Sequence, residues 1–135
     1  MTPRAPLKKS GGETATVAAI LQYLRLRGHT AMRMNSRVVM LPGKGGKDRP
    51  YRMGVKGMAD IIGWVDFCQY PTPGYRAIPC TGRGQYHVPR WLAIEVKSAT
   101  GQPTPEQTAF LAAVVKAGGL AFVARSVRDV QEKGL

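Results

Sequence analysis

Two acidic residues and one lysine stand in or beside strongly apolar segments of the chain. Glu95 and Lys97 lie two positions apart in the apolar run 91–97, and Asp60 directly precedes another apolar run. Because alternate side chains of a strand share a face, Glu95 and Lys97 are predicted to point the same way and Val96 into the core. Burying such charges is costly unless they are paired. Two interpretations are open: a salt pair on an edge strand, or a chemical centre.

Asp60 favours the chemical centre. It lies between two glycines at the start of a predicted strand, and adjacent strands would bring its carboxylate and that of Glu95 within reach of one cation. Mg²⁺ and Mn²⁺ prefer oxygen ligands, and they activate water and offset charge on a phosphodiester. We expect Asp60, Glu95 and the backbone carbonyl of Val96 to hold such a metal. Lys97 would orient or activate the attacking water.

The charge of the chain points to a polyanionic partner. Twenty Lys and Arg stand against eight Asp and Glu, which gives a net charge of +12. A surface with so much charge of one sign attracts nucleic acid, although a merely soluble basic protein has the same balance. No stretch approaches the roughly 18 apolar residues of a membrane span, and residues 1–4 do not resemble a secretory signal. We therefore expect a cytoplasmic protein.

The pattern of apolar residues predicts an α/β fold with a central mixed sheet flanked by helices. Residues 1–9 are interpreted as a loose basic arm and 10–135 as one domain. The predicted elements are a helix at 11–27 with a Ser10–Glu13 capping box, a strand region at 31–41 broken at Asn35, a doubly buried strand at 61–67, a strand at 91–97, a helix opening at Thr104, a strand at 120–124 and a short helix at 126–133.

Two glycine-rich segments are predicted to be irregular. Residues 42–50 contain Gly and Lys but lack the spacing of a phosphate-binding P-loop, so a solvated positive loop near a polyanion is the better interpretation. Residues from about 68 to 90 are interpreted as a long loop, with a short hairpin considered at 75–88. Such a long loop in a small domain is usually functional or mobile.

Several ordered motifs together resemble one known family, the virus-type replication-repair nuclease (VRR-NUC) domain of the PD-(D/E)XK superfamily. They are Gly57-x-x-Asp60-Ile61-Ile62-Gly63, Ala93-Ile94-Glu95-Val96-Lys97-Ser98 and Thr104-Pro105-Glu106-Gln107, with Arg33-x-Asn35-Ser36 and Gly118-Gly119-x-Ala121-x-Val123 in support. The resemblance spans about residues 12–128, and the chain is similar in length to small stand-alone phage and bacterial members.

The resemblance implies a restriction-endonuclease-like core (αβββαβ) and a Mg²⁺- or Mn²⁺-dependent endonuclease. By position, the metal-binding Asp and Glu fall on Asp60 and Glu95, and the catalytic Lys on Lys97. The family's helix Gln falls on Gln107, and the acidic residue of its first helix on Glu13, which would join the catalytic or metal-binding set. Small members are similar to enzymes that cut branched DNA or Holliday junctions as homodimers in replication, repair or recombination. The 68–90 segment is longer than this pattern leads us to expect.

Some residues have a structural interpretation as well. Glu13 and Gln107 suit capping boxes, and Asp66 suits a strand end. Candidate contacts to DNA are the exposed-type residues Arg33, Asn35, Lys44, Lys47 and Arg49, with Arg83 and Arg90 as further candidates. The alternatives to a structure-selective nuclease are a non-cleaving basic DNA-binding protein on the same scaffold and a restriction-type, sequence-specific endonuclease.

Overall fold

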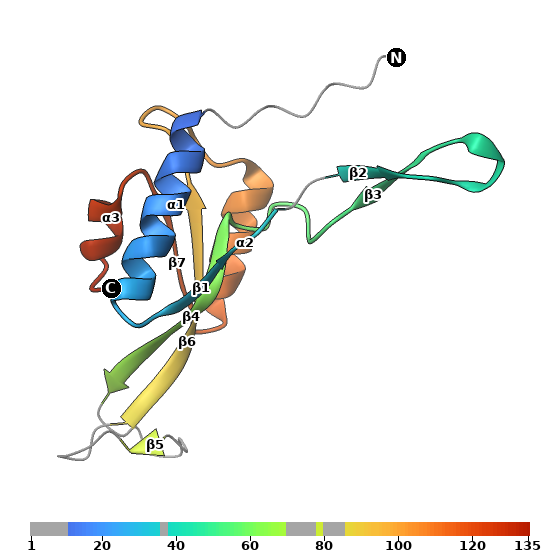
Figure 1. Cartoon of the computed structure of the whole chain (residues 1–135). Coiled ribbons are helices and arrows are strands. Elements are labelled where there is room, and N and C mark those ends of the chain that lie inside the picture. Colours follow the sequence, from blue (N-terminus) through green and yellow to red (C-terminus); the bar gives the residue numbers. More distant parts are fainter. Residues whose placement is uncertain (1–10, 36–37, 70–77, 80–85) are drawn as a thin grey trace.

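The protein is an α/β structure built on a mixed sheet flanked by helices (Figure 1). The computed structural model describes residues 11–35, 38–69, 78–79 and 86–135. The main sheet has the strand order β1-β4-β6-β7, and the short β5 pairs with the other end of β6. The strands are β1 (Thr30–Arg33), β4 (Ile61–Gln69), β5 (Ile78–Pro79), β6 (Tyr86–Val96) and β7 (Leu120–Ala124), and the helices are α1 (Gly11–Leu26), α2 (Pro105–Lys116) and α3 (Val127–Gln131).

The sheet is mixed because β7 runs parallel to its neighbour β6, whereas the other strand pairs are antiparallel. β1 pairs with β4 and β4 with β6, in both cases antiparallel. β6 and β7 are parallel, and α2 makes the crossover between them. Parallel neighbours need such a long connection, which the predicted helix at Thr104 supplies.

One face of the sheet is covered by α1, with α3 beside it. Val17, Ile20 and Leu24 of α1 recur at helical spacing and are buried against Ile94 and Val96 of the sheet. The main core therefore lies between α1 and the central strands. The helix predicted at 11–27 is confirmed for 11–26, whereas its proposed cap Ser10 and the 1–9 arm lie outside the described residues.

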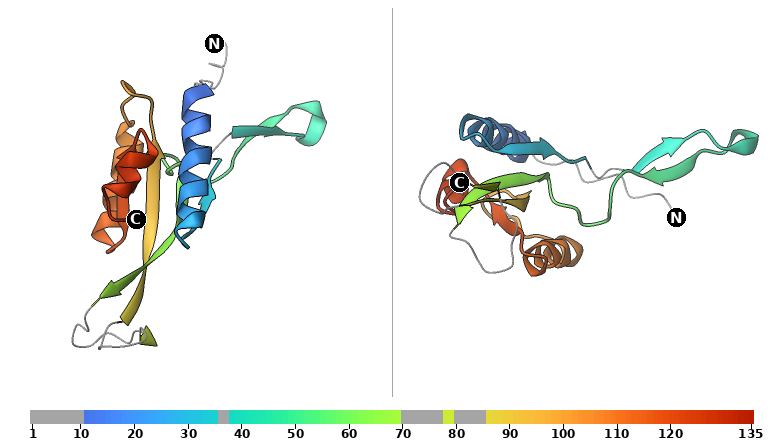
Figure 2. Two further views of the ribbon diagram at one scale, coloured as in Figure 1. Left: turned by 60° about the vertical axis from the view of Figure 1, so that its left-hand side comes forward. Right: turned by 90° about the horizontal axis from the view of Figure 1, so that it is seen from below.

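The opposite face is only partly covered. α2 packs over β6 and β7, with Leu111 against Ala93 and Ala59 (Figure 2). Beyond α2 this face is open, so that Trp64 of β4 has 46% of its surface exposed. The prediction of a strand at 61–67 buried on both faces is therefore wrong for one face over residues 61–65, because α2 packs over β6 and β7.

The predicted long loop at 68–90 is wrong at both ends. β4 continues to Gln69 and β6 already begins at Tyr86, so these segments pair as strands. Ile78 and Pro79 pair antiparallel with His87 and Tyr86, which confirms that part of the proposed hairpin. Prolines and glycines are typical of loops, although edge and strand-end positions of a sheet tolerate them.

A second, two-stranded sheet stands apart from the main one. It consists of β2 (Val38–Leu41) and β3 (Arg49–Arg52), with the 3₁₀ turn η1 (Lys44–Gly46) at its end. The break predicted in the 31–41 strand region is confirmed, since β1 and β2 belong to different sheets. The loop predicted at 42–50 is corrected in part, because Arg49 and Pro50 belong to a strand. Within the described residues, no helix is both long and apolar enough to span a bilayer.

Candidate active site

The candidate site lies where the N-terminal end of β4 meets the C-terminal end of β6. Antiparallel register pairs Ile61 with Ile94, so Asp60 and Glu95 take the next pair of opposite positions. Opposite residues of antiparallel strands project to the same face with Cβ atoms roughly 5 Å apart. Both carboxylates are largely removed from solvent, with 7% of Asp60 and none of Glu95 exposed.

The two acids project away from the α1 core. Ile94 and Val96 are buried in that core, so Glu95 between them points to the α2 side, as the alternation predicted. The Oδ2 atom of Asp60 accepts a hydrogen bond of 3.0 Å from the backbone amide of Val96. Val96 therefore contacts Asp60 through its backbone N–H. The Val96 carbonyl, which was the expected metal ligand, takes no part in this hydrogen bond.

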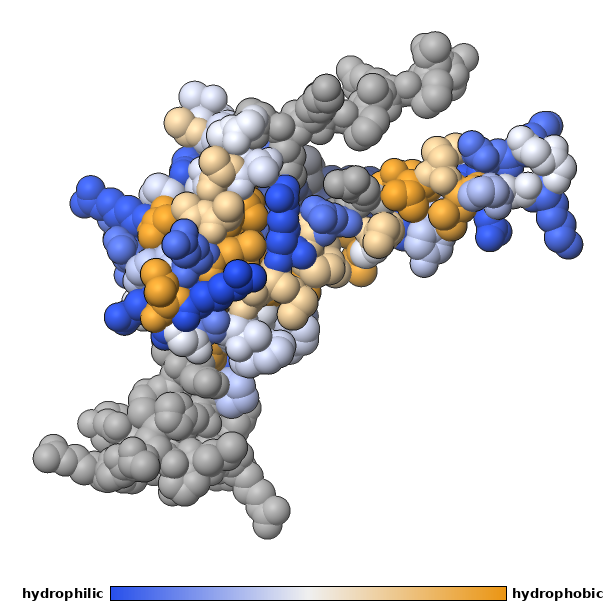
Figure 3. Space-filling model, in the orientation of Figure 1, coloured by the Kyte–Doolittle hydropathy of each residue, from blue (hydrophilic) through white to orange (hydrophobic). Residues whose placement is uncertain are grey.

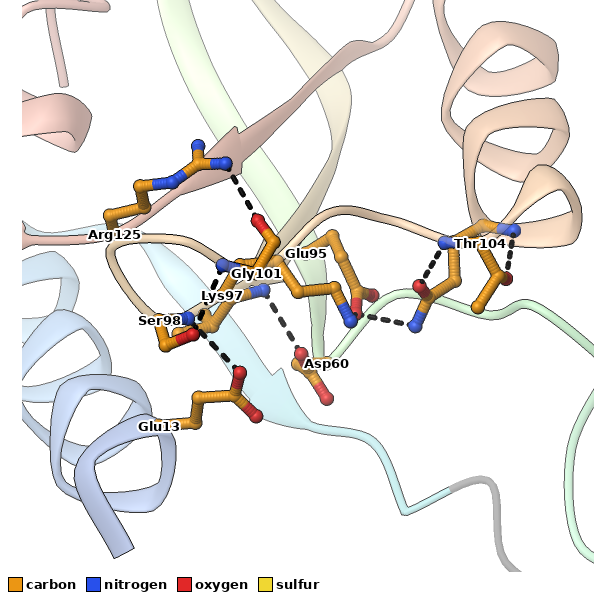
Figure 4. A network of polar contacts seen from close by, with 10 residues as sticks. Glu13, Asp60, Glu95, Lys97, Ser98, Gly101, Thr104 and Arg125 are labelled. Atoms are coloured by element: carbon orange, nitrogen blue, oxygen red, sulfur yellow. Dashed lines mark hydrogen bonds and ion pairs between the residues drawn. The ribbon is translucent and has the colours of Figure 1, made fainter. Parts of the chain in front are cut away.

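Lys97 and Gln107 both contact the Glu95 carboxylate (Figure 4). The Nζ atom of Lys97 lies 2.9 Å from Glu95 Oε1, and the side chain of Lys97 is 13% exposed. The Nε2 atom of Gln107 donates to the same oxygen at 2.5 Å. A buried carboxylate with an ammonium and an amide donor is electrostatically offset and held in one orientation.

Gln107 is placed by the capping box that the sequence predicted. Thr104 is the N-cap of α2: its Oγ1 accepts from the Gln107 amide, and the Gln107 Oε1 accepts from the Thr104 amide. The structural and the functional interpretations of Gln107 are thus not exclusive, because one end of its amide group serves the cap and the other end contacts Glu95.

Glu13 reaches the end of β6 from α1. Its Oε1 accepts a 3.0 Å hydrogen bond from the amide of Ser98, directly after Lys97. The Ser98 hydroxyl accepts from the Gly101 amide, and the carbonyl of Gly101 accepts from Arg125 (Figure 4). Glu13 therefore fixes the turn that follows Lys97. In the described part of the chain, no three His, Cys, Asp or Glu side chains group as a metal site, so Glu13 does not form a cluster with the two acids.

The segment before Asp60 is anchored on α2. Gly57 has φ +80°, and a Cβ atom added there would lie 2.5 Å from the backbone of Glu106. Lys56 forms a salt bridge of 2.5 Å with Glu106, and the hydrogen bond from Lys56 is the main reason that the pKa of Glu106 falls from 4.5 to about 2. The carbonyl of Asp60 accepts from the Met34 amide on the other side. Backbone contacts on both sides therefore position Asp60.

The predicted DNA contacts fall into separate places. Arg33 and Asn35 are exposed at the end of β1, where Arg33 pairs with Ile61 next to Asp60. Lys44, Lys47 and Arg49 are exposed on the β2–β3 hairpin, away from the acids. The two further candidates, Arg90 and Arg83, stay untested. The guanidinium of Arg90 donates to the carbonyls of Gly118 and Gly119, and Arg83 lies outside the described residues, as does the side chain of Asp66.

Two exposed tryptophans on the face of the acids were not predicted from the sequence. Trp64 and Trp91 lie opposite each other on β4 and β6, four positions along each strand from Asp60 and Glu95 and on the same face. They are 46% and 63% exposed. Trp91 also borders a shallow apolar pocket with Phe110 and Val114 of α2. Two-residue steps forward from Asp60 and back from Glu95 would have placed both indoles on the face of the acids.

Comparison with known proteins yielded no relatives: no protein-family model, no curated protein and no solved structure matches this chain.

The donor chemistry of the site fits a hard divalent cation. Asp60 and Glu95 offer carboxylate oxygens from two adjacent strands, and Mg²⁺ is commonly held by one or two carboxylates with waters completing its shell. The nearby Lys97 adds a positive charge that a purely metal-holding site does not need. This combination suits chemistry on an anionic substrate.

Proposed function

We propose that this protein is a Mg²⁺- or Mn²⁺-dependent DNA endonuclease of the PD-(D/E)XK type, similar to VRR-NUC domains and selective for branched DNA. The observation that carries the proposal is the buried acid pair, Asp60 opposite Glu95, with Lys97 on the Glu95 carboxylate. Like charges on opposite strand positions are destabilising. Their retention in a chain with only eight acidic residues is hard to explain by stability or by polyanion binding alone.

Each residue has a defined task in this proposal. Asp60 and Glu95 would hold the metal, which when bound supplies a more basic water and offsets charge on the phosphate. Lys97, held at 2.9 Å from Glu95, would orient the water and stabilise the negative charge that develops on the phosphate. Gln107 fixes the Glu95 carboxylate, and Glu13 fixes the backbone just after Lys97.

The fold is compatible with the proposal at the level of element order. The helix α1, the sheet strands, α2 and β7 follow one another as in the αβββαβ arrangement that the family resemblance implies. A homodimer with two sites would suit symmetric cuts in a four-way junction, and the same resemblance would place the protein in a bacterial or phage-infected cell.

Cleavage of a defined set of DNA substrates tests the proposal. Labelled linear duplex, flap and four-way junction DNA are incubated with the protein and Mg²⁺ or Mn²⁺, beside Asp60→Asn, Glu95→Gln and the control Glu132→Gln. Glu132 is exposed and forms an ion pair with Arg128 at the same end of α3, so its variant should keep full activity. The two site variants should lose about 100-fold or more in rate. Equal binding by all proteins without any cleavage would favour the non-cleaving DNA-binding protein.

The third candidate function gives a different pattern in the same experiment. A restriction-type enzyme would cut linear duplex at fixed sequences and would not distinguish the branched substrates. A structure-selective enzyme should cut near the branch point whatever the sequence.

A further inference from the structure

The β2–β3 hairpin, residues 38–52, is a two-stranded ribbon that extends away from the rest of the molecule (Figure 1). Its two strands pair only with each other, from Val38–Arg52 to Leu41–Arg49, and neither joins the main sheet. All four residues of β3 are exposed, and three of the four in β2 are as well. Neither face of the ribbon is therefore covered by the chain's own core.

The turn and the second strand of the ribbon are strongly basic. Residues 43–52 contain four basic residues and one acidic residue, Asp48, for a local charge of +3. Lys44, Lys47, Arg49 and Arg52 are all exposed, and the outer end is the hydrophilic part of the ribbon (Figure 3). None of the four takes part in a salt bridge described for this part of the chain.

The tight turn places two of these residues at the same end of the ribbon. Gly45 and Gly46 have positive φ values of 78° and 76°, and a Cβ atom on Gly43 would meet the carbonyl oxygen of Lys47 at 2.3 Å. The backbone therefore folds back on itself within a few residues, which brings Lys44 and Lys47 to one end. The arginines at the two ends of β3 lie three positions apart and so project to opposite faces of the ribbon.

We infer that the β2–β3 ribbon binds double-stranded DNA by entering its major groove. This inference rests on the proposed function: the ribbon would bind the duplex part of the substrate beside the cleavage point. The major groove of B-DNA admits a two-stranded β-ribbon, whereas the major groove of an RNA helix is too narrow for side chains to read. Arginines on both ribbon faces would meet the phosphates on the two groove walls.

A second copy of the chain is the competing occupant of this surface. An isolated two-stranded hairpin is marginally stable in water, so the exposed Val38, Met40 and Tyr51 favour some partner. Each copy carries a net charge of +12, however, so a ribbon of +3 would dock on a surface of the same sign. The charge of the ribbon is complementary to DNA and not to this protein.

The test compares two variants with the same loss of charge. The ribbon variant is Lys44→Gln, Lys47→Gln and Arg49→Gln, and the matched control is Arg25→Gln, Arg27→Gln and Lys116→Gln, all exposed on α1, α2 and the turn after α1. Affinity for a labelled 30-base-pair duplex is measured at several salt concentrations in EDTA, so that no cleavage takes part.

Loss of three phosphate contacts should lower the slope of log affinity against log salt by about 2.7, and weaken binding on the order of 100-fold near 0.15 M salt. The control variant should bind less than about 10-fold more weakly than the wild type. Equal weakening by both variants would mean that only net charge matters and would overturn the inference.

The groove is tested by chemical protection. Bound protein should shield guanine N7, which lies in the major groove, from dimethyl sulfate, and should leave adenine N3 in the minor groove reactive. The ribbon variant should lose this protection. Protection of adenine N3 alone would overturn the inference, and so would a ribbon variant that changes the oligomeric state with an unchanged affinity for DNA.

The outcome is separable from that of the nuclease proposal. Binding in EDTA measures the ribbon apart from cleavage: Asp60→Asn removes a negative charge outside the ribbon, so it should bind duplex at least as tightly as the wild type. Ribbon-dependent duplex binding without any metal-dependent cleavage would leave the inference standing and reject only the nuclease. Cleavage that is lost with Asp60→Asn but unaffected by the ribbon variant would support the nuclease and reject the inference about the ribbon.

Discussion

Gln107 and Glu95 are joined by a hydrogen bond of 2.5 Å between Nε2 and Oε1, and the same Gln107 side chain accepts from the N-cap amide of its own helix. One side chain thus couples the start of α2 to the carboxylate at the end of β6. Since Lys97 contacts the same Glu95 oxygen, the helix cap and the acid–lysine pair form one connected polar group.

This coupling predicts different outcomes for two substitutions of Gln107. Gln107→Glu keeps an oxygen for the Thr104 amide but places a carboxylate against Glu95, so the free energy of unfolding at pH 7 should fall by about 1–3 kcal/mol. Part of the loss should be recovered in mildly acidic buffer, where one of the two acids binds a proton. Gln107→Ala should cost a similar amount at all pH values. Chemical denaturation at pH 5 and pH 8 distinguishes the two, and an identical pH response would contradict the coupling.

Without metal, the protein should be at least as stable when one member of the acid pair is neutralised. Asp60→Asn retains an oxygen that can accept from the Val96 amide and removes one of two like charges at opposite positions. We expect its Tm in EDTA to equal or exceed that of the wild type. Addition of Mn²⁺ at about 100 times the dissociation constant should raise wild-type stability by about 2.7 kcal/mol and leave Asp60→Asn unchanged. Equal metal shifts in both proteins would remove Asp60 from the metal site.

Lys97 should matter for cleavage and not for metal binding. Lys97→Met keeps the apolar length of the side chain but removes the ammonium that lies 2.9 Å from Glu95. The Mn²⁺-induced rise in Tm should persist, whereas cleavage of branched DNA should fall by about 100-fold or more. In EDTA this variant should lose several kcal/mol, in the range of about 3–5, because Glu95 loses its charged partner. A variant that cuts at the full rate would contradict the role assigned to Lys97.

Gly57 should be far less tolerant of a side chain than Gly28, although both have φ +80°. Gly28→Ala meets no atom within 4 Å and should cost only the left-handed strain of about 1–2 kcal/mol. Gly57→Ala adds a clash with the Glu106 backbone at 2.5 Å, which must shift either α2 or the segment leading to Asp60. We expect a larger loss in Tm for Gly57→Ala than for Gly28→Ala. Only Gly57→Ala should also weaken the Mn²⁺-induced rise in Tm.

The Lys56–Glu106 pair should stabilise the folded protein less as the pH becomes acidic. The pKa of Glu106 is lowered to about 2, chiefly by its hydrogen bond with Lys56, so the folded state disfavours protonation more than the unfolded state does. The contribution is complete above about pH 4.5 and is lost as the pH falls toward 2. Tm measured from pH 6 to pH 2 should fall less steeply in Glu106→Gln, and Lys56→Gln should have a similar effect. An unchanged profile in both variants would contradict the pairing.

Local patterns in the sequence were sufficient to predict most elements. The helix cap at Thr104 and the strand at 120–124 are confirmed at the predicted residues, because capping and short apolar runs depend on neighbours in the chain. Alternation within one strand likewise predicted that Glu95 and Lys97 face away from Val96. The nuclease activity, the metal and the dimer stay predictions.

Only the tertiary structure decided which elements become neighbours. The sequence identified Asp60 and Glu95 as acids at strand ends, but their opposition depends on a register between β4 and β6 that no local pattern specifies. The exposed face of Trp64 follows from how far α2 reaches, and the basic loop became a separate ribbon because residues 49–52 pair with β2. Residue types and spacing thus determined the available chemistry, and long-range backbone pairing determined which side chains meet, because it joins positions far apart in the chain.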